Sequence, residues 1–359
     1  MMMQQDASAA APVAADGAEL KAGKVTHKDG SWDAGYLDAE NRVQGVGVRM
    51  VIPGREWYEG EFKDGVPHGH GTWHHQSGLV TCGEFKDSKV HGMARREFPS
   101  GDVFSGEFRD GKSSGRGTYK FANGDVFEGE FAEDGASGRG IKQFASGMRY
   151  TGEFVKDAMT GRGLLQYSNG DVYKGEFEDN MMSGKGLYQF ENGDYCMGAF
   201  KSDAMDGPGE LFFANGDKYV GDFKNDEPCG KGIYIWSPGA DGVAAETYEG
   251  QFENSLMQPR GRRTFRDGSS WTGSFRDGKP NGEGIFKFGP SGPDAEREVK
   301  CTYKLGMLQD AEAIVASAPA VPRQVAGTHA MGGGGPATPA PTDDATKEEA
   351  MGVDALMSF

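Results

Sequence analysis

The chain has 359 residues, of which 58 are Gly, and 38 Lys and Arg against 54 Asp and Glu give a formal net charge of −16. Glycine is about twice as frequent as in an ordinary globular protein, but the chain has no run of Gly-X-Y triplets, which excludes collagen. The acidic charge argues against nucleic acid as a partner, because duplex binding needs many Lys and Arg contacts to phosphate. It also disfavours adhesion to anionic lipid.

The sequence predicts a protein of a reducing compartment, the cytoplasm. Its four cysteines, Cys82, Cys196, Cys229 and Cys301, are far apart and do not form a disulfide framework. No stretch approaches the roughly 18 continuous apolar residues of a membrane helix. The N-terminal residues contain no apolar block of signal-peptide length, so secretion is not expected.

The chain begins with residues 1–28, which are rich in Met, Gln, Ala and Asp and are predicted to be disordered. A repeat array follows over residues 29–306. Gly-x-Phe recurs every 23 residues, then resumes after a step of 29, and a weaker unit at Gly35 precedes the run. The longer step places six inserted residues in the Ser237–Thr247 region. The repeats begin their Gly-x-Phe triplets at Gly60, Gly83, Gly106, Gly129, Gly152, Gly175, Gly198, Gly221, Gly250 and Gly273. Eleven repeats are predicted.

The first half of each repeat has the pattern of a β-strand, as the copy that starts at Phe104 illustrates. Phe104, Gly106 and Phe108 alternate, and a period of two puts all three on one face of a strand. Asp110 and Gly111 come next, and both residue types tolerate the positive φ of a tight hairpin turn.

The second half of the repeat has a similar pattern. Gly117, Tyr119 and Phe121 alternate along a second strand, and Asn123-Gly124-Asp125 turns the chain into the next repeat. Each repeat is therefore predicted to be a β-hairpin. The predicted fold class is all-β, an elongated single antiparallel sheet in the form of a twisted rod or trough, with disordered termini. A lone hairpin is marginal in water, so its stability should come from the neighbouring repeats.

The glycine between the two aromatic residues leaves room for a ring to lie over the bare backbone. One face of the sheet is thus predicted to be an aromatic–glycine row, and the other face to carry glutamates. The turn aspartates and these glutamates are interpreted as a solvated surface with Asx turns, which also discourages edge aggregation. Calcium binding would need carboxylates that converge in one loop, and the sequence has no such loop.

This pattern resembles the MORN (membrane occupation and recognition nexus) repeat. Tyr58–Phe62 and Tyr173–Phe177 show the motif aromatic-x-Gly-Glu-Phe, and Gly-x-Gly and Asn-Gly-Asp follow in the same repeat. The resemblance covers residues 29–306. Departures occur at the leading aromatic position and at the second glycine; they are Asp33, Thr81, Cys196 and Ala94.

The resemblance implies a β rod without catalysis of its own, so the chain is not expected to be an enzyme. Such arrays occur in junctophilins, plant lipid kinases, some histone methyltransferases, and cytoskeletal and ciliary proteins. In this chain about 50 residues follow the array, fewer than a kinase or methyltransferase domain needs. That favours a resemblance to the stand-alone cytoskeletal and ciliary members, such as the radial spoke head subunits of motile cilia. We expect a cytoskeletal scaffold, with axonemal proteins as partners; the alternatives are a tether that binds phospholipid and an adaptor that positions an enzyme.

A partner is expected on the aromatic face, because buried aromatic residues dominate binding energy at interfaces. Self-association through the open ends of the sheet is a further possibility. The predicted partner-binding residues are Trp73, Phe121, Tyr188, Phe213, Trp236 and Phe286.

Two polar clusters are candidate sites. His68 and His91 occupy the same repeat position two strands apart, about 9.6 Å, so a shared zinc would need His70 or His74 between them. Surface histidines, an inter-chain zinc and a pH-sensitive contact all remain open. The second cluster is basic, Arg260, Arg262, Arg263 and Arg266, and would contact an acidic partner or a lipid headgroup, or form ordinary strand surface.

No catalytic, cofactor-binding or metal-binding residue is predicted. The Gly-x-Gly pairs lie between strands and turns rather than between a strand and a helix, which argues against a nucleotide site. No Ser or Cys has a partnered base. After the array, residues 307–318 are predicted to form a short capping helix. Residues 319–359 are predicted to be a disordered Ala/Pro/Gly-rich tail, with a docking motif or a frayed end at Lys347–Phe359.

Overall fold

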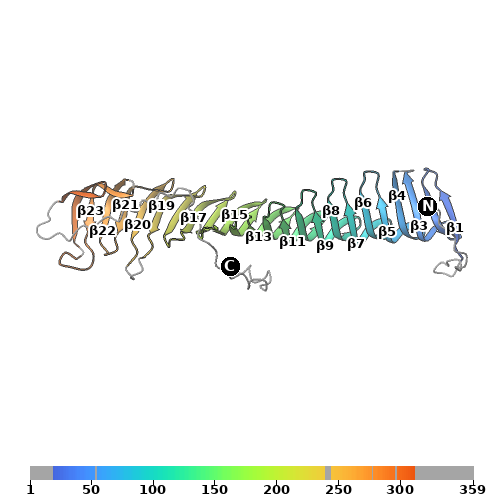
Figure 1. The fold of residues 1–359 in the computed structure, drawn as a ribbon, viewed down its shortest axis with the longest axis horizontal. Coiled ribbons are helices and arrows are strands. Elements are labelled where there is room, and N and C mark those ends of the chain that lie inside the picture. The colour runs from blue at the N-terminus through green and yellow to red at the C-terminus, as the bar shows by residue number, and fades with distance from the viewer. Residues whose placement is uncertain (1–18, 53–54, 239–243, 277, 296, 312–359) are drawn as a thin grey trace, which may run out of the picture. The chain divides into compact units, whose positions relative to one another are not determined.

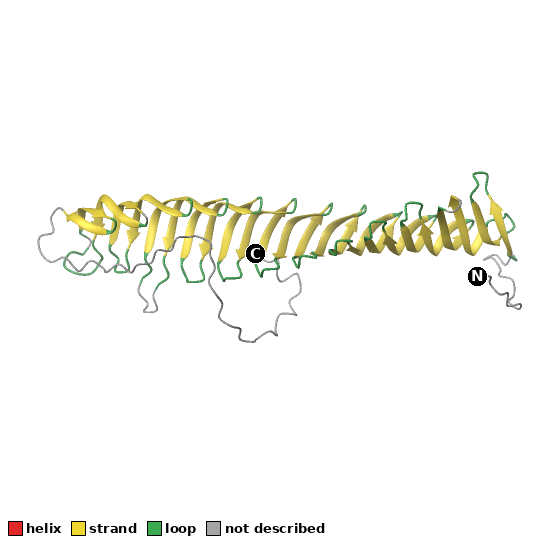
Figure 2. Ribbon diagram, turned by 45° about the horizontal axis from the view of Figure 1, so that its top comes forward, coloured by secondary structure: helices red, strands yellow, loops and turns green. Residues whose placement is uncertain are grey.

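The computed structural model describes residues 19–52, 55–238, 244–276, 278–295 and 297–311. Every regular element in these residues is a β-strand, which confirms the all-β prediction (Figure 2). The described residues contain no helix that is long and apolar enough to cross a membrane. The chain divides into two compact units, Met1–Ser168 and Asn169–Phe359, and each is described by itself.

Unit 1 is an antiparallel sheet in which each strand pairs with the next one along the chain (Figure 1). Its strands are β1 (Lys21–Thr26), β2 (Trp32–Leu37), β3 (Val43–Ile52), β4 (Glu56–Lys63), β5 (Val66–His74), β6 (Val80–Lys86), β7 (Lys89–Glu97), β8 (Val103–Arg109), β9 (Lys112–Lys120), β10 (Val126–Ala132), β11 (Gly135–Gln143), β12 (Arg149–Val155) and β13 (Ala158–Gln166).

Unit 2 has the same sequential antiparallel order. Its strands are β14 (Val172–Glu178), β15 (Met181–Gln189), β16 (Tyr195–Lys201), β17 (Ala204–Phe212), β18 (Lys218–Lys224), β19 (Glu227–Ile235), β20 (Thr247–Glu253), β21 (Leu256–Thr264), β22 (Ser270–Arg276), β23 (Lys279–Lys287), β24 (Glu298–Lys304) and β25 (Met307–Ala311).

Each repeat is a hairpin of two strands, as the sequence pattern predicts. In β8 and β9, Phe104 pairs with Tyr119 and Gly106 with Gly117, and a β-bulge follows. The two residues of the hairpin turn, Asp110 and Gly111, have φ values of 51° and 95°. Both lie in the left-handed region, which explains why Asp, Asn and Gly recur there.

The core of each unit lies on one face of its sheet, where a leading ring covers the glycines of its own hairpin. Tyr173 is fully buried, and its ring lies within 3.0 Å of where a Cβ would stand on Gly175 or Gly186. Phe177 and Phe200 pack edge-on against it, with ring centroids 5.2 and 5.0 Å away. The aromatic–glycine prediction is confirmed, and we name these leading rings the buried ring row: Tyr58, Phe104, Phe127, Tyr150, Tyr173, Tyr219, Tyr248 and Trp271.

Where a repeat lacks the leading ring, another side chain fills the space. Cys196 is too small to cover its glycines, and the methyl group of Met205 lies over Gly198 and Gly209 instead. Met205 is only 2% exposed. The core of this repeat is therefore closed by a flexible thioether side chain from the second strand.

At the first repeat, Asp33 occupies the position of the leading ring and is 4% exposed. Burial alone would raise the pKa of Asp33, but hydrogen bonds from Arg49 and His27 outweigh burial and lower it. Arg49 donates through two nitrogens to the Asp33 carboxylate, at 2.7 and 2.8 Å. A charged pair with its hydrogen bonds satisfied thus takes the place of the ring.

Aspartates in the hairpin turns connect successive repeats. The N–H of Asp157 donates to the carbonyl of Ala136 at 3.0 Å, and its carboxylate accepts from the N–H of Ala136 at 2.7 Å. Three other turns form the same pair of bonds, through Asp134, Asp203 and Asp226. At the opposite ends of the strands, turn carboxylates such as Asp102 accept from the next repeat, here from the N–H of Ala122 at 2.7 Å. These carboxylates therefore hold repeats together, beyond the solvated role expected from sequence.

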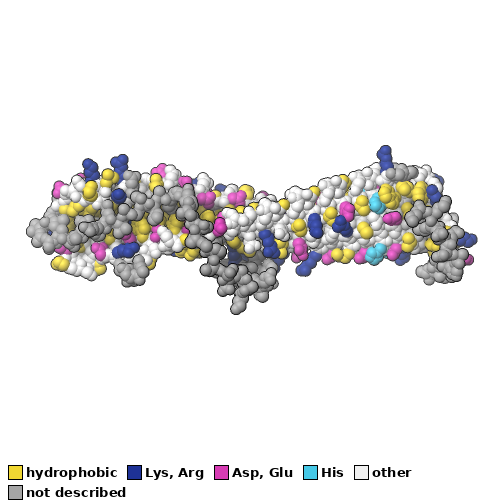
Figure 3. Space-filling view, in the orientation of Figure 1, with side chains coloured by type: hydrophobic (Ala, Val, Ile, Leu, Met, Phe, Trp, Pro, Cys, Tyr) yellow, Lys and Arg dark blue, Asp and Glu magenta, His cyan; other side chains and the backbone are white. Residues whose placement is uncertain are grey.

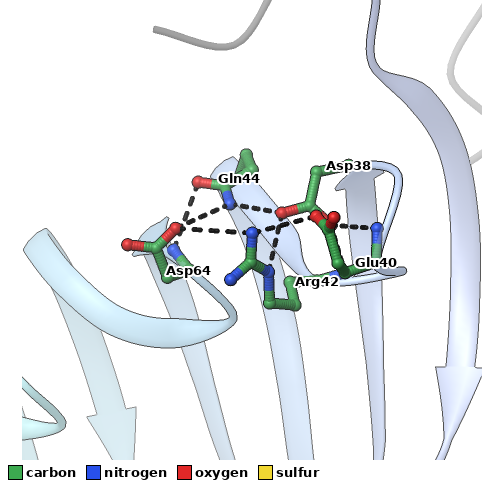
Figure 4. Close-up of polar contacts among 5 residues, drawn as sticks. All are labelled: Asp38, Glu40, Arg42, Gln44 and Asp64. Carbon is green, nitrogen blue, oxygen red and sulfur yellow. Dashed lines mark hydrogen bonds and ion pairs between the residues drawn. The ribbon is translucent and has the colours of Figure 1, made fainter. Parts of the chain in front are cut away.

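The first hairpin turn uses a larger polar network for the same purpose (Figure 4). Asp38 accepts from Arg42 at 2.9 Å and from Gln44 at 2.8 Å. Gln44 in turn accepts from the N–H of Asp64, in the turn of the next hairpin, at 3.2 Å. Glu40 completes the network as an ion-pair partner of Arg42 at 3.0 Å. The cluster is therefore a link between two repeats.

Two predictions at the ends of the array are wrong where the structure tests them. Lys21–Thr26, predicted to be disordered, forms β1, and Met307–Ala311, predicted to begin a helix, forms β25. Without β1 and β25 the outer edges of β2 and β24 would expose unpaired N–H and C=O groups, and an added strand pairs with these groups along its length. Residues 1–18, the rest of the predicted helix and the tail at 319–359 lie outside the described residues.

Candidate functional site

A second set of aromatic side chains in unit 2 lies at the end of the second strand of each repeat. There the chain enters the turn that leads to the next repeat, which we name the outer turn. The backbone N–H of Phe213, Phe265 and Phe288 closes these turns by donating to Asp217, Ser269 and Arg297 respectively. We name this set, with the side chains between its turn residues, the unit-2 ladder: Phe213, Tyr234, Trp236, Arg263, Phe265, Phe286 and Phe288.

The first half of the unit-2 ladder runs from Phe213 to Arg263. The ring centroids of Phe213 and Tyr234 are 5.9 Å apart, and those of Tyr234 and Trp236 are 5.0 Å apart. The Arg263 guanidinium then lies over the Trp236 ring at 4.7 Å, a cation–π contact.

The second half continues without a break. Arg263 is 5.6 Å from the centroid of Phe265. Phe265 is 6.3 Å from Phe286, and Phe286 is 5.2 Å from Phe288. The ladder therefore crosses several repeats of unit 2 as one chain of ring contacts.

The unit-2 ladder differs from the core in exposure. Phe213, Trp236, Phe265, Phe286 and Phe288 are all half-buried, whereas the leading rings of the same unit, such as Tyr219, are fully buried. None of the atoms nearest to the described glycines belongs to a ladder side chain. Among the glycines that the structure describes, the ladder thus covers none.

Polar contacts hold the ladder in place. The Tyr234 hydroxyl donates to Asp217 at 2.7 Å, and burial together with this carboxylate raises the pKa of Tyr234. Arg263 pairs with Glu246 and donates to the carbonyl of Gly278 at 3.3 Å. Because these partners fix the side chains before any ligand arrives, the surface is preorganised for binding.

Unit 1 carries a shorter set at the same repeat positions, which we name the unit-1 ladder. Phe98 lies 5.8 Å from Tyr119, and Tyr119 lies 4.5 Å from Phe121. The Lys142 ammonium follows, 5.3 Å from Phe121 and 4.9 Å from Phe144. A lysine, whose charge is more strongly hydrated than that of arginine, thus lies among these rings.

The predicted partner-binding residues fall into four places. Phe213, Trp236 and Phe286 lie in the unit-2 ladder, and Phe121 lies in the unit-1 ladder. Tyr188 packs on Phe190 at 4.7 Å and donates to Asp171 at 2.8 Å.

Trp73 lies apart from these groups. Its ring centroid is 5.8 Å from that of Tyr58, and its indole N–H donates to Glu56 at 3.0 Å. The structure thus places the six residues at related repeat positions and joins three of them in one surface.

Sequence reasoning omitted several ladder residues that share the repeat positions of the predicted ones. They are Phe98, Tyr119, Phe144, Tyr234, Phe265 and Phe288, and Phe190 has the same repeat position beside Tyr188. These residues could have been predicted, because each lies a whole number of repeat steps from one of the predicted partner-binding residues. What the spacing does not show is which rings touch.

The four arginines of the basic cluster do not share one face. Arg260 and Arg262 pair with Ser274 and Thr272 and are exposed. Arg263 pairs with Trp271 on the aromatic face and belongs to the unit-2 ladder. Arg266 is exposed in the outer turn. Strand alternation separates neighbours such as Arg262 and Arg263.

The histidines that Figure 3 shows lie over the strands of unit 1. His68 and His91 each lie beside a turn aspartate, Asp87 at 3.7 Å and Asp110 at 3.6 Å. Within the part of the chain that the structure describes, no group of three or more His, Cys, Asp or Glu side chains could hold a metal ion.

Comparison with protein families identifies the family to which the chain belongs. Ten consecutive segments match the MORN repeat family: residues 58–80, 82–103, 104–126, 127–149, 150–172, 173–195, 196–218, 219–240, 248–270 and 271–291. These segments make up more than half of the chain, which therefore belongs to the MORN repeat family. The resemblance inferred from the sequence motifs is confirmed.

The chain matches no curated protein sequence. Among solved structures, it is similar to the wild-type TCP10 domain of Danio rerio CPAP, with a TM-score of 0.33 and 14% identity over 55% of this chain and 93% of that one. The TCP domain of Drosophila melanogaster SAS-4 (dCPAP), in complex with a proline-rich motif of Ana2 (dSTIL), has a TM-score of 0.27 and 13% identity, over 61% and 95%. Inactive virginiamycin B lyase from Staphylococcus aureus has a TM-score of 0.12 and 11% identity, over 78% and 93%. At these scores the likenesses carry no argument about function.

Proposed function

We propose that this MORN repeat protein is a non-catalytic scaffold that binds other proteins through the unit-2 ladder and assembles them on the cytoskeleton, in the axoneme of a motile cilium or flagellum. The observation that carries the proposal is the continuous ladder itself, whose rings other than Tyr234 are half-buried. It joins six aromatic side chains and an arginine, and it lies over none of the glycines that the core rings cover.

The composition of the ladder fits a protein interface. Trp, Tyr and Arg are the residues most enriched among interface hot spots, where they are flanked by contacts that exclude water. Trp236 and Arg263 supply two of these types at the half-buried surface, and Tyr234, which is only 7% exposed, packs against Trp236. An extended segment of a partner could lie across several repeats and cover them together.

The ciliary location is the finer part of the proposal, and its support is the resemblance to radial spoke head subunits. A phospholipid tether is the alternative, and it depends on the basic cluster. That cluster is a weaker candidate because Arg263 is engaged with Glu246 and Trp236, on the face opposite to Arg260 and Arg262.

The test is extraction of cells that express the tagged full-length protein with a non-ionic detergent. The wild-type protein is expected to remain with the insoluble cytoskeleton and to label cilia or flagella. The double variant Phe265→Asp and Phe288→Asp is expected to be released. The matched control is Lys231→Asp, an acidic substitution at an exposed position on the opposite face, which is expected to be retained.

Two results would contradict the proposal. The first is complete release of the wild-type protein, which would redirect the search to liposomes and the arginines. The second is retention of the ladder variant when its circular dichroism and unfolding midpoint match those of the control.

A further inference from the structure

We propose that the unit-2 ladder is a binding surface for a polyproline II helix, and that its occupant is this chain's own segment Pro319–Pro341. The inference rests on the proposed function, since it names what covers the surface through which the scaffold would bind its partner. It adds that a partner must displace the tail to bind.

The first argument is the spacing of the ladder. Phe213, Trp236, Phe265 and Phe288 come from successive repeats, and each begins the outer turn of its repeat. A repeat contributes two strands, and neighbouring strands lie about 4.8 Å apart. Successive turn residues are therefore about 9.6 Å apart along the ladder.

This spacing matches one regular peptide conformation. A polyproline II helix has three residues per turn and rises about 3.1 Å per residue, so every third residue faces the same way at intervals of about 9.3 Å. An extended strand covers a similar distance in three residues, but its side chains alternate between faces. An α-helix rises about 1.5 Å per residue and places no whole number of turns in this interval. Prolines separated by three positions would thus meet successive rings.

The second argument is a hydrogen-bond donor on the ladder. The indole N–H of Trp73 donates to Glu56 and that of Trp271 donates to Ser274. Within the described residues the indole N–H of the half-buried Trp236 has no such acceptor. Polyproline II has no internal hydrogen bonds, so its carbonyl groups are available as acceptors. Aromatic grooves recognise this conformation because it is already ordered before binding.

The third argument is the sequence and reach of the tail. Pro319-Ala-Val-Pro322 and Pro336-Ala-Thr-Pro339 both place prolines three positions apart.

The ladder is within reach of these prolines. Ala311 pairs with Cys301, and Cys301 pairs with Gly284, four residues before Phe288. Two strand spacings and four residues along a strand separate Ala311 from Phe288, roughly 16 Å in all. The eight residues from Ala311 to Pro319 span up to about 27 Å when extended. The tail can therefore reach the last ring of the ladder on its own chain.

The test uses the full-length protein labelled with fluorotryptophan and fluorine NMR, with the Trp236 resonance assigned from a Trp236→Phe variant. Replacing Pro319, Pro322, Pro336 and Pro339 by Ala is expected to shift the Trp236 resonance and leave those of Trp73 and Trp271 unchanged. A synthetic peptide of residues 317–343, added to the proline variant, is expected to restore the original shift in a saturable titration.

Two matched substitutions in the proline variant sharpen the titration. Phe265→Ala is expected to weaken peptide binding by about tenfold or more, as loss of a hot-spot ring does. Phe121→Ala, the equivalent change in the unit-1 ladder, is expected to leave it unchanged.

An identical Trp236 resonance in the wild-type protein and the proline variant would overturn the inference, and so would failure of the peptide to restore the shift. A wild-type resonance that changes with protein concentration would assign the occupant to a second copy and reject binding within one chain. The proposed function is tested separately. Ladder-dependent cytoskeletal retention without any tail effect would reject this inference alone, whereas a tail effect with retention independent of the ladder would reject the scaffold alone.

Discussion

The buried ring row and the ladders are both aromatic, but the residues of the buried ring row vary less from repeat to repeat than those of the ladders. The buried ring row has the same geometry in both units: Tyr150 in unit 1 and Tyr219 in unit 2 are fully buried, and each ring lies over paired glycines. The ladders differ, since Lys142 lies among the rings of unit 1 whereas Arg263 joins those of unit 2. Contact with the glycine backbone favours a flat ring at this position, so Tyr, Phe or Trp recurs there in most of the repeats. The ladder faces solvent, so it is free to vary between repeats, and that is where specificity for a partner can arise.

The largest expected effect separates the two sets directly. Tyr219→Ala should cost about 3–5 kcal/mol of unfolding free energy, because it removes a fully buried ring and leaves Gly221 and Gly232 uncovered. Phe213→Ala, in the ladder, should cost about 1 kcal/mol, since its ring is half-buried. Urea unfolding of both variants measures the difference. Equal losses would remove the distinction between core and ladder.

The next effect tests the glycines beneath the rings. Gly186→Ala would place a Cβ within 3.0 Å of the Tyr173 ring, which is fully buried and cannot easily move, so we expect a loss of about 1–3 kcal/mol. Gly135→Ala is the matched control, because its nearest neighbour, Asp157, would lie at an ordinary 3.4 Å. The midpoint of thermal unfolding should fall for the first variant and stay within error for the second. A tolerated Gly186→Ala would show that the ring does not need bare backbone.

A smaller effect is expected at the links between repeats, which neither aromatic set provides. Asp157→Ala removes the bond from the Ala136 N–H and puts a residue that disfavours positive φ at 69°, so it should cost about 1–2 kcal/mol. Asp157→Gly also loses the bond but accommodates the backbone, and should cost less. Hydrogen exchange at Ala136 reports the local loss. Two variants of equal stability would assign the whole effect to the carboxylate.

The smallest effect at neutral pH concerns the hydroxyl groups of the buried ring row. Burial raises the pKa of Tyr248 from 10.0 to about 12. A raised pKa in the folded state means that the stabilising contribution is complete below pH 10 and is lost as the pH rises through about 12. Tyr248→Phe should therefore make the decline of stability between these values shallower, and should change little at pH 7, since Phe104 and Phe127 occupy the same position elsewhere. Unfolding midpoints measured across this range check it; an unchanged slope would show that Tyr248 does not titrate on unfolding.

Much of the fold was predictable because the repeat is a local pattern. The alternation of Phe104, Gly106 and Phe108 gives the strand and its buried face, and Asp110-Gly111 gives the turn. The terminal strands β1 and β25 were missed because their pairing depends on the open edges of β2 and β24 rather than on their own sequence.

The candidate site was predictable only as a type of surface. Phe213, Trp236 and Phe286 were selected by their aromatic character and repeat position, but Arg263 was assigned to a basic cluster. Its place between Trp236 and Phe265 depends on which face its strand presents and on the pairing with neighbouring strands. Likewise, nothing in the motif shows that Met205 fills the space left by Cys196.

The repeat, the hairpin and the pairing of ring with glycine follow from the amino-acid sequence, because each depends on residues a few positions apart and on strand alternation. The folded chain was needed to show which rings join into a ladder, which arginine joins them, and how turn aspartates such as Asp157 bind the preceding repeat. Those contacts cross from one repeat to the next. Their distances depend on strand register and on the side chains of two repeats at once, which a pattern within one repeat does not encode.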